Sequence, residues 1–380
     1  MATQPATQST VLPSPPGVVS LRPVASERRC ELLVYTYPSA RPLFDALMRT
    51  HAGSSTIPTR EAKCDWGEFE TGWPNIHFEA GDSIYGRHAV FLTSFYKPTN
   101  IFQQISLAIA LPRNHVKSLT VVVPFFGPGT MERVEEEGVL ASAETMAKML
   151  SAPMPLTSSG PTTIIIYDIH ALQERFYFTD NVRVLLVSAI PTLMSYIKQD
   201  GRKTVLVFPD DGAAKRFGKR VTLPYLVCGK VRERDERFIR ILDGNNIGLD
   251  TSKLRLRATD PDVGSIFTEE DRDAQFLIVD DLCNSGATLV RCAEALRLNG
   301  ARRINAYCTH AVFGNDSWRK FTEGGQWHDV FDRFIVTNTI VETTEKLKGT
   351  APFVVLDITP DLWNHLTCMV DSYEGNATTH

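Results

Sequence analysis

The sequence has little of what marks several classes of protein. It contains no block of lysines and arginines, and 40 basic against 44 acidic residues leave a formal charge of −4, so nucleic acid is not an expected partner. The seven cysteines show neither a CxxC pair nor a metal-type spacing, which favours a reducing, cytoplasmic compartment. No apolar run approaches the roughly 18 residues of a membrane span, so no membrane partner is expected.

Residues 1–28 differ in composition from the rest of the chain. They are rich in Ser, Thr, Pro, Ala and Val, and Arg22 is their only charge before Glu27. Such a segment cannot bury enough apolar surface to fold alone, so we expect a disordered tail. Organellar targeting is the weaker alternative, because targeting segments usually carry several arginines and are not interrupted by so many prolines.

From about Cys30 the chain alternates short apolar runs with helical patterns. Near-continuous apolar runs predict buried strands of mostly parallel sheets with helices on both faces. The runs lie at 32–35, 89–92, 119–123, 163–167, 204–208, 225–228, 276–279, 304–308 and 334–336. A length of 380 residues with 43% apolar composition suits two α/β domains. We expect these domains at 29–184 and 185–345, followed by a C-terminal segment, 346–380, that packs back on the first domain.

The most informative stretch begins with the apolar run 276–279. Two adjacent acids, Asp280 and Asp281, follow it, and small residues then lead into a helix start. Ligands of open α/β sheets gather outside the carboxyl ends of strands, and a small-residue turn at a helix N-terminus can face a phosphate. Adjacent carboxylates can accept hydrogen bonds from a vicinal diol. The stretch therefore predicts a sugar phosphate site, with an ordinary solvated turn as the alternative.

Two other strand ends carry candidate metal-side groups. His170 follows the run 163–167, and Asp210 follows the run 204–208. Groups at separate strand ends can share a divalent cation with nucleotide phosphates, because Mg²⁺ takes few protein ligands and fills its shell from water and substrate. For each residue alone, a hydrogen-bonded cap or a salt-bridged turn is the alternative.

A third strand end carries two cations, Lys230 and Arg232. In an extended segment this spacing puts both side chains on one face. Positioned Lys, Arg and Mg²⁺ stabilise the charge that builds on a transferring phosphoryl group. The alternative is a solvated face, since the next residues, 233–237, form a mixed-charge run.

Taken together, these segments resemble the ribose-phosphate diphosphokinases, also called phosphoribosyl pyrophosphate synthetases. The resemblance extends from about Cys30 to Ser372 and rests on six segments in register, at 69–75, 168–176, 208–212, 230–232, 276–288 and 307–313. It implies two tandem type I phosphoribosyltransferase-like domains, each a mostly parallel sheet flanked by helices. It also implies an oligomer that uses Mg²⁺ and transfers the β,γ-diphosphoryl group of ATP to the 1-hydroxyl of ribose 5-phosphate.

The resemblance implies a role for each matched residue. Ribose 5-phosphate would be held by Asp280, Asp281, Asn284, Ser285, Gly286, Ala287 and Thr288. Mg²⁺–ATP would lie at His170 and Asp210, and Lys230 and Arg232 would stabilise the transferring group. The segment with Phe69 and Asn75 would reach the adenine from a neighbouring subunit, placing the active site at a subunit interface.

Two departures separate this chain from the common form of that family. Thr130 and Met131 stand where the common form has an Arg-Gln pair that contacts ATP. The acidic triplet 135–137 replaces a basic regulatory stretch and cannot bind anionic phosphate or ADP in the same way. Both departures resemble the class II subgroup, which implies activity independent of inorganic phosphate, little inhibition by ADP and tolerance of other nucleoside triphosphates.

Two other functions stay open. A non-catalytic, synthetase-associated member of the family would share the fold, but retention of His170, Asp210, Lys230 and Arg232 argues against it. A phosphoribosyltransferase, or a phosphoribosyl-binding regulator, could use the same acidic loop. Such proteins need only one domain of this type, so the tandem arrangement disfavours them.

Overall fold

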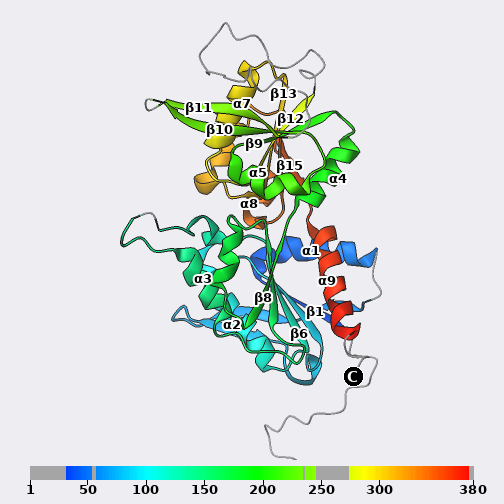
Figure 1. Ribbon diagram of the computed structural model, residues 1–380. Coiled ribbons are helices and arrows are strands. Elements are labelled where there is room, and N and C mark those ends of the chain that lie inside the picture. Colours follow the sequence, from blue (N-terminus) through cyan, green and yellow to red (C-terminus); the bar gives the residue numbers. More distant parts are fainter. Residues whose placement is uncertain (1–30, 54–56, 135, 234–235, 245–273, 376–380) are drawn as a thin grey trace, which may run out of the picture.

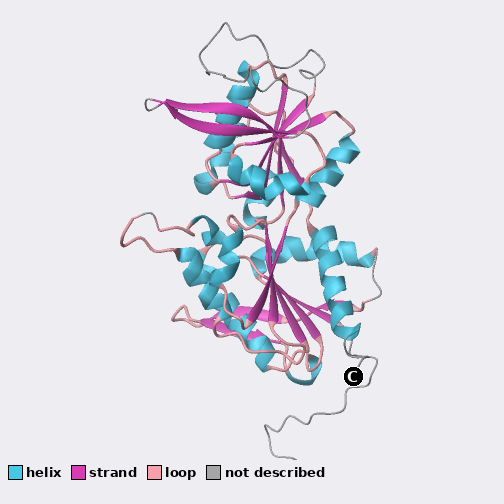
Figure 2. Ribbon diagram, viewed as in Figure 1, coloured by secondary structure: helices cyan, strands magenta, loops and turns pink. Residues whose placement is uncertain are grey.

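The computed structural model describes residues 31–53, 57–134, 136–233, 236–244 and 274–375, with the backbone alone for 229–233 and 236–244. Two α/β units lie end to end, and each has a central sheet (Figure 1). Helices cover both faces of each sheet (Figure 2). The fold class expected from the alternating apolar runs is therefore confirmed.

The first unit is built on six parallel strands in the order β2-β1-β5-β6-β7-β8. Their bounds are β1 Leu32–Thr36, β2 Thr59–Glu61, β5 His88–Leu92, β6 Ser118–Val123, β7 Thr162–Tyr167 and β8 Val182–Val187. Every residue of β5, β6 and β7 is buried, because helices cover both faces of the sheet. The helices are α1 Arg41–Ala52, α2 Ile101–Arg113, α3 Ser142–Ser151 and, from the far end of the chain, α9 Thr359–Gly375.

Helix α9 lies beside α1 on the first unit (Figure 1). Leu362 and Trp363 of α9 are buried in one cluster with Phe44 of α1. At the end of α9, Glu374 accepts a hydrogen bond from His88 Nε2 at 2.8 Å and one from Lys117 Nζ at 2.5 Å. The C-terminal helix is thus part of the first unit's core.

The second unit is built on seven strands in the order β11-β10-β9-β12-β13-β14-β15, all parallel to their neighbours except β11. Their bounds are β9 Thr204–Phe208, β10 Tyr225–Glu233, β11 Glu236–Gly244, β12 Gln275–Cys283, β13 Arg303–Ala311, β14 Arg333–Thr337 and β15 Phe353–Leu356. The helices are α4 Ile190–Asp200, α5 Asp211–Phe217, α7 Ala287–Leu298 and α8 Val341–Leu347. The hairpin β10–β11 projects sideways from the unit (Figure 1).

The boundary expected near residue 184 falls inside β8. Strand β8 pairs with β7 along its whole length, from Thr162↔Val182 to Tyr167↔Val187, so it completes the first sheet and does not begin the second. The next element, α4, buries Ile190 and Leu193 in the core of the second unit. We therefore propose to divide the units between Val187 and Ile190.

Strand β12 is longer than the apolar run that predicted it. Its ladder with β9 reaches Ile278↔Val207, whereas its ladder with β13 continues to Cys283↔Ala311. The sequence predicted that the two acids follow the strand. They are instead part of it, near its C-terminal end, and lie beyond the end of β9. The end of β9 leaves space beside Asp280 and Asp281, and this space is where the two units face each other.

Candidate active site

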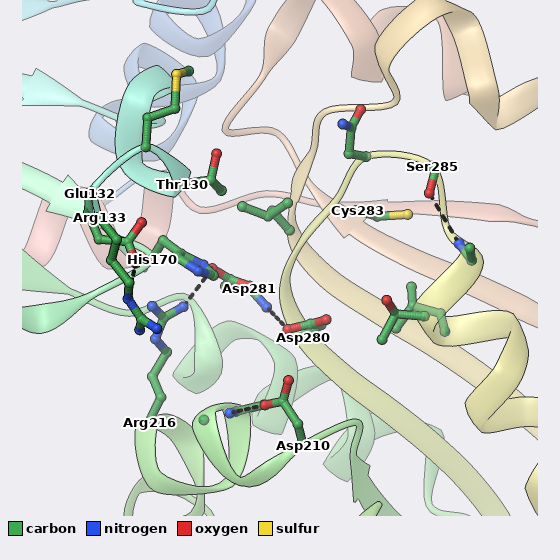
Figure 3. Close-up of a pocket in the computed structure, with 18 of the residues that line it drawn as sticks. Thr130, Glu132, Arg133, His170, Asp210, Arg216, Asp280, Asp281, Cys283 and Ser285 are labelled. Atoms are coloured by element: carbon green, nitrogen blue, oxygen red, sulfur yellow. Dashed lines mark hydrogen bonds and ion pairs between the residues drawn. The ribbon is translucent and has the colours of Figure 1, made fainter. Parts of the chain in front are cut away.

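A cavity of about 1200 Å³ opens between the two units (Figure 3). The first unit contributes residues from the segment 130–140 and His170, and the second contributes the start of α5, Arg216 and residues 280–289. Eleven of the site residues predicted from the sequence line it: Thr130, Met131, His170, Asp210, Asp280, Asp281, Asn284, Ser285, Gly286, Ala287 and Thr288.

The small-residue turn is fixed by contacts with the loop after β13. Asn284 Oδ1 accepts a hydrogen bond from Gly314 N at 3.0 Å, and the Asn284 carbonyl accepts one from Ser317 Oγ at 2.5 Å. Gly286 has φ 82°, and a Cβ on it would lie 2.4 Å from the ring of Phe321. Only glycine fits here, and the turn leads directly into the N-terminus of α7. The result is a rigid cradle of the kind that binds phosphate.

The two acids of the motif are in different electrostatic states. Asp281 is 4% exposed, and although burial alone would raise its pKa, the hydrogen bond from His170 and the charge of Arg216 hold it below the usual range. Burial, followed by the charge of Asp281, raises the pKa of Asp280 well above its usual range. The two carboxyl groups therefore differ: Asp281 favours its ionised form, and Asp280 holds a proton more readily than Asp281 does.

His170 is placed by the turn after β7. Asp168 has φ 32°, a left-handed conformation that Asp tolerates better than most residues. Its Oδ2 accepts hydrogen bonds from Ala189 N at 2.9 Å and from Thr309 Oγ1, on β13, at 2.7 Å. This buried carboxylate ties the two units together, and it sets His170 at the floor of the cavity.

His170 and Arg216 meet at one carboxylate oxygen. Asp281 Oδ2 lies 2.7 Å from His170 Nδ1 and 2.7 Å from Arg216 Nη1. Figure 3 shows the three side chains side by side, with Asp280 just beyond them. The hydrogen bond to Asp281 raises the pKa of His170 more than burial lowers it. The salt-bridged alternative for His170 is thus realised, and its other ring nitrogen, Nε2, makes no hydrogen bond among the described residues.

Asp210 caps helix α5. Its Oδ1 accepts a hydrogen bond from Ala213 N at 3.0 Å, which satisfies one of the free N–H groups of the first turn. The capping alternative for Asp210 is therefore realised, and its Oδ2 makes no hydrogen bond with the described parts of the chain. Within the described parts of the chain, no group of three or more His, Cys, Asp or Glu side chains is arranged to hold a metal ion.

The edge of the cavity in the first unit is a short helical turn, η5 Gly127–Thr130. Behind it, Glu174 is fully buried; its Oε1 accepts a hydrogen bond from Ala171 N at 2.9 Å, whereas its Oε2 has no partner among the described residues. Burial raises the pKa of Glu174 to about 8. A neutral carboxylic acid therefore supports this edge at neutral pH.

Two predicted site residues, Phe69 and Asn75, do not line the cavity, and two others, Lys230 and Arg232, are described by their backbone alone. Phe69 and Asn75 belong to a two-stranded hairpin, β3 Cys64–Glu68 and β4 Pro74–Phe78, and Phe69 is 55% exposed. Lys230 and Arg232 lie on β10, where their backbones pair with Ile239 and Arg237 of β11. The side chains of Lys230 and Arg232 lie outside the described part of the structure.

Sequence reasoning missed three buried or half-buried charged residues of the site: Arg216, Glu132 and Glu174. Arg216 had one usable signal, because it comes one and a half helical turns after the capping Asp210 and so lies in the last turn of the same short helix. Glu132 and Glu174 stand in segments without clear periodicity, and nothing in the sequence distinguishes them from solvated acids.

No helix in the described residues is long and apolar enough to cross a membrane. Family models match at two places: the N-terminal domain of ribose phosphate pyrophosphokinase at residues 50–153, and the phosphoribosyl synthetase-associated domain at residues 271–360. Together they fall on both units and on both sides of the cavity.

Several relatives match over most of the chain. Ribose-phosphate pyrophosphokinase 4 of Arabidopsis thaliana is 41% identical over 318 residues, which cover 83% of this chain and 86% of that protein. Ribose-phosphate pyrophosphokinase 3, mitochondrial, of Spinacia oleracea is 38% identical and covers 82% of this chain and 71% of its own. A bacterial ribose-phosphate pyrophosphokinase, from a Marinomonas species, is 28% identical and covers 72% of this chain and 77% of its own.

The fold has a solved counterpart. The crystal structure of phosphoribosylpyrophosphate synthetase from Mycobacterium smegmatis superposes with a TM-score of 0.67 at 21% identity, covering 90% of this chain and 99% of that one. Fold and cavity thus define a tandem phosphoribosyltransferase-like protein. With relatives at 40–41% identity over four fifths of its length, the chain belongs to the ribose-phosphate pyrophosphokinase family. Its greater likeness to the plant proteins than to the bacterial ones agrees with the class II resemblance.

Proposed function

We propose that this chain transfers the β,γ-diphosphoryl group of ATP to O1 of ribose 5-phosphate, giving phosphoribosyl pyrophosphate and AMP. One observation carries the proposal. A single cavity joins a glycine-dependent phosphate cradle, residues 284–288, to the strand-end groups His170 and Asp210. An acceptor site and a donor site are therefore within reach of each other, as direct transfer between two bound substrates requires.

The reaction needs no protein nucleophile. The 1-hydroxyl oxygen of the ribose attacks the β-phosphorus, the bond from that phosphorus to the α,β-bridging oxygen breaks, and AMP leaves while the hydroxyl proton is released. In this proposal the 5-phosphate lies against 284–288 and the vicinal hydroxyls against Asp280 and Asp281. Asp281 Oδ2 already has two partners, so Asp280, which has no ion pair among the described residues, is the freer acceptor.

The donor set of the cavity fits Mg²⁺ that arrives with ATP. Six acidic side chains line the cavity against two arginines, namely Glu132, Glu136, Asp210, Asp211, Asp280 and Asp281 against Arg133 and Arg216. This excess of negative charge would repel free polyphosphate. Asp210 Oδ2 and His170 Nε2 would hold the ion, which takes its other ligands from water and phosphate. Bound there, Mg²⁺ would neutralise the phosphate oxygens.

The catalytic cations in the proposal are Lys230 and Arg232. What supports them is position: both stand on β10, the strand next to β9, whose end carries Asp210. Their hairpin projects from the unit, so it can approach the donor phosphates from outside the cavity (Figure 1). Their role would be to stabilise the charge on the diphosphoryl oxygens in the transition state.

We also propose a homo-oligomer in which Phe69 and Asn75 of one subunit serve the cavity of another. Two features support it. These residues do not line the cavity of their own chain, and Phe69, Trp73 and Phe102 form an exposed aromatic group, with Trp73 and Phe102 rings 5.8 Å apart. Sedimentation at increasing protein concentration tests it, since a monomer at assay concentrations would contradict the proposal.

The activity is tested by incubating the purified chain with ATP, Mg²⁺ and ribose 5-phosphate. We expect AMP and phosphoribosyl pyrophosphate in equal amounts, and neither product when ribose 5-phosphate is omitted. A synthetase-associated protein without activity would give no AMP. A phosphoribosyltransferase would also give none, but would release pyrophosphate from phosphoribosyl pyrophosphate and a nucleobase.

Independence from inorganic phosphate is proposed for the same reaction. Its support is the acidic character of the segment after Met131, where Glu136 lines the cavity and Glu137 is exposed; Glu135 lies outside the described residues. We expect full activity in a phosphate-free buffer. An enzyme that stayed inactive until phosphate was added would contradict this part of the proposal without affecting the rest.

For location we propose the cytoplasm. Residues 1–28, expected to be a disordered tail, lie outside the described residues, and relatives named mitochondrial and chloroplastic match this chain at 38–39% identity. A fluorescent protein fused behind residues 1–28 should remain in the cytosol. Import of that fusion into an organelle would show that the segment is an address.

A further inference from the structure

The contact between His170 and Asp281 joins the two units inside the cavity. Their positions are 111 residues apart in the sequence, and each unit supplies one partner. Asp281 is 4% exposed, whereas the side chain of His170 is 40% exposed. The carboxylate is therefore the fixed member of the pair, and the imidazole is the member that remains accessible from the cavity.

Arg216 is what fixes the carboxylate. Its side chain is 12% exposed, and its Nη1 lies 2.7 Å from the same Oδ2 that contacts His170. A buried carboxylate without a cation would be strongly destabilised, and removing one partner of such a pair leaves the other charge uncompensated. Because α5 holds Arg216 and β12 holds Asp281, both anchors belong to the second unit. They form a rigid support against which a residue of the first unit rests.

A carboxylate that accepts a hydrogen bond from Nδ1 sets the tautomer of a histidine. The neutral ring then carries its proton on Nδ1, and the lone pair is on Nε2, the nitrogen that ligates a metal ion or accepts a hydrogen bond. Carboxylates behind metal-binding histidines commonly set the tautomer and orientation of the ring in this way. Here the carboxylate comes from the acidic motif of the acceptor side.

We propose that Asp281 and Arg216 are positioning residues: Asp281, held by Arg216, fixes His170 of the other unit with its Nε2 lone pair facing the cavity. The assignment rests on the function proposed above and refines it. Of the two acids in the motif, Asp280 serves the ribose, whereas Asp281 serves the donor side by orienting His170. The acceptor half of the cavity thereby orients a residue of the donor half.

The substitutions Asp281→Leu and Asp281→Asn together separate this role from a merely structural one. His170 Nδ1 and Arg216 Nη1 both contact Asp281 Oδ2, so an amide oxygen in that place can still accept both hydrogen bonds, whereas a leucine side chain accepts neither. Without an acceptor facing Nδ1, the neutral ring is no longer held with its proton on that nitrogen.

The tautomer can be observed without substrates. In protein labelled with ¹⁵N-histidine, at a pH high enough to keep the ring neutral, the His170 signal is assigned as the one that His170→Gln removes. We expect the Nδ1-protonated pattern in the unmodified chain and in Asp281→Asn, and the loss of this pattern in Asp281→Leu. An unchanged pattern in Asp281→Leu, or an Nε2-protonated ring in the unmodified chain, would overturn the proposal.

Steady-state kinetics provide a second test of the proposal. Asp281→Leu and Arg216→Met should lower kcat by about 10- to 100-fold, and Asp281→Asn by less, with a smaller change in KM for ribose 5-phosphate, whereas Asp280→Asn should chiefly raise that KM. Arg216→Lys should recover part of the loss, and this variant also serves if Arg216→Met does not fold. Lys215→Met, which removes an exposed charge from the neighbouring position of α5, is the matched control and should leave kcat unchanged.

A double substitution decides whether Arg216 acts through Asp281. Added to Asp281→Leu, the change Arg216→Met should cost little further activity, because the contact through which Arg216 acts on His170 is already broken. A loss as large as in the unmodified background would mean that Arg216 touches substrate directly, which contradicts the proposal. If the unmodified chain itself forms no AMP, the proposed function fails, while the tautomer experiment still tests the contact.

Discussion

Gly286 packs directly against the ring of Phe321, so close that a Cβ at position 286 would lie 2.4 Å from the ring carbon. Phe321 is 1% exposed and belongs to the main core cluster of the second unit. The proposed phosphate cradle thus shares a contact with the core, and a change in one must displace the other.

The substitution Gly286→Ala should therefore act on binding and on stability together. We expect KM for ribose 5-phosphate to rise and the free energy of unfolding to fall by about 1–3 kcal/mol, because the ring or the turn must move. Gly349→Ala is the control: it has the same left-handed backbone, φ 73°, with nothing within 4 Å of the added Cβ. If both variants lose equal stability, backbone strain alone explains the effect.

A second prediction concerns the projecting hairpin. Lys230→Ala should lower kcat by about 100- to 1,000-fold, the range for loss of one group that stabilises a transition state. The thermal midpoint should hardly change. Lys219→Ala, which removes an exposed cation from the same unit, should leave both quantities alone. A kcat within error of the unmodified chain would remove Lys230 from the mechanism.

The predicted strands show what an apolar pattern can reveal. Central parallel strands such as β6 and β7 are buried along their whole length and form unbroken apolar runs in the sequence. Strands at sheet edges give weaker signals. The edge strand β2 has no apolar run that predicts it, and β8 resembles the start of the second unit because pairing with β7 is not visible in its own residues.

For the candidate site, the sequence likewise predicted the main residues but not the contacts between them. Strand ends of a parallel sheet meet at one edge, which is why Asp210 and Asp280 could be grouped from the sequence. His170 follows a strand of the other sheet, so the family resemblance, and not a shared sheet edge, grouped it with them. The hydrogen-bond partners of these residues could not be predicted. The bond from His170 to Asp281 depends on how two units face each other, and no local pattern encodes that geometry.

A third prediction concerns the C-terminal helix. Although burial alone would raise the pKa of Glu374, hydrogen bonds from His88 and Lys117 lower it. A carboxyl whose folded pKa is depressed stabilises the protein above its unfolded pKa and loses that contribution as the pH falls. Glu374→Gln should therefore lower the unfolding midpoint at neutral pH, and the difference from the unmodified chain should shrink below about pH 4.5. Urea titrations at several pH values measure it.

Glu374→Gln also tests whether α9 belongs to the first unit's core. The matched control is Asp371→Asn, an exposed acid on the same helix. We expect the control to leave the midpoint unchanged at every pH. Equal destabilisation by both variants would mean that the helix responds to net charge and not to the contact with His88.

The last prediction concerns Glu174, whose pKa is shifted in the direction opposite to that of Glu374. Burial raises its pKa from 4.5 to about 8, so between these values the unfolded chain has released a proton that the folded chain still holds. Stability contributed by this group must fall as the pH rises through that window, by an amount on the order of a few kcal/mol, and then level off above about pH 8.

Glu174→Gln removes the titration while keeping an oxygen that can accept the hydrogen bond from Ala171 N. The variant should match the unmodified chain at about pH 5 and exceed it in stability by a growing margin up to about pH 8. Glu294→Gln, at an exposed position of α7, should follow the unmodified chain throughout. Parallel curves for Glu174→Gln and the unmodified chain would mean that Glu174 is ionised when folded. Its unpartnered Oε2 would then need a cation that the described residues do not supply.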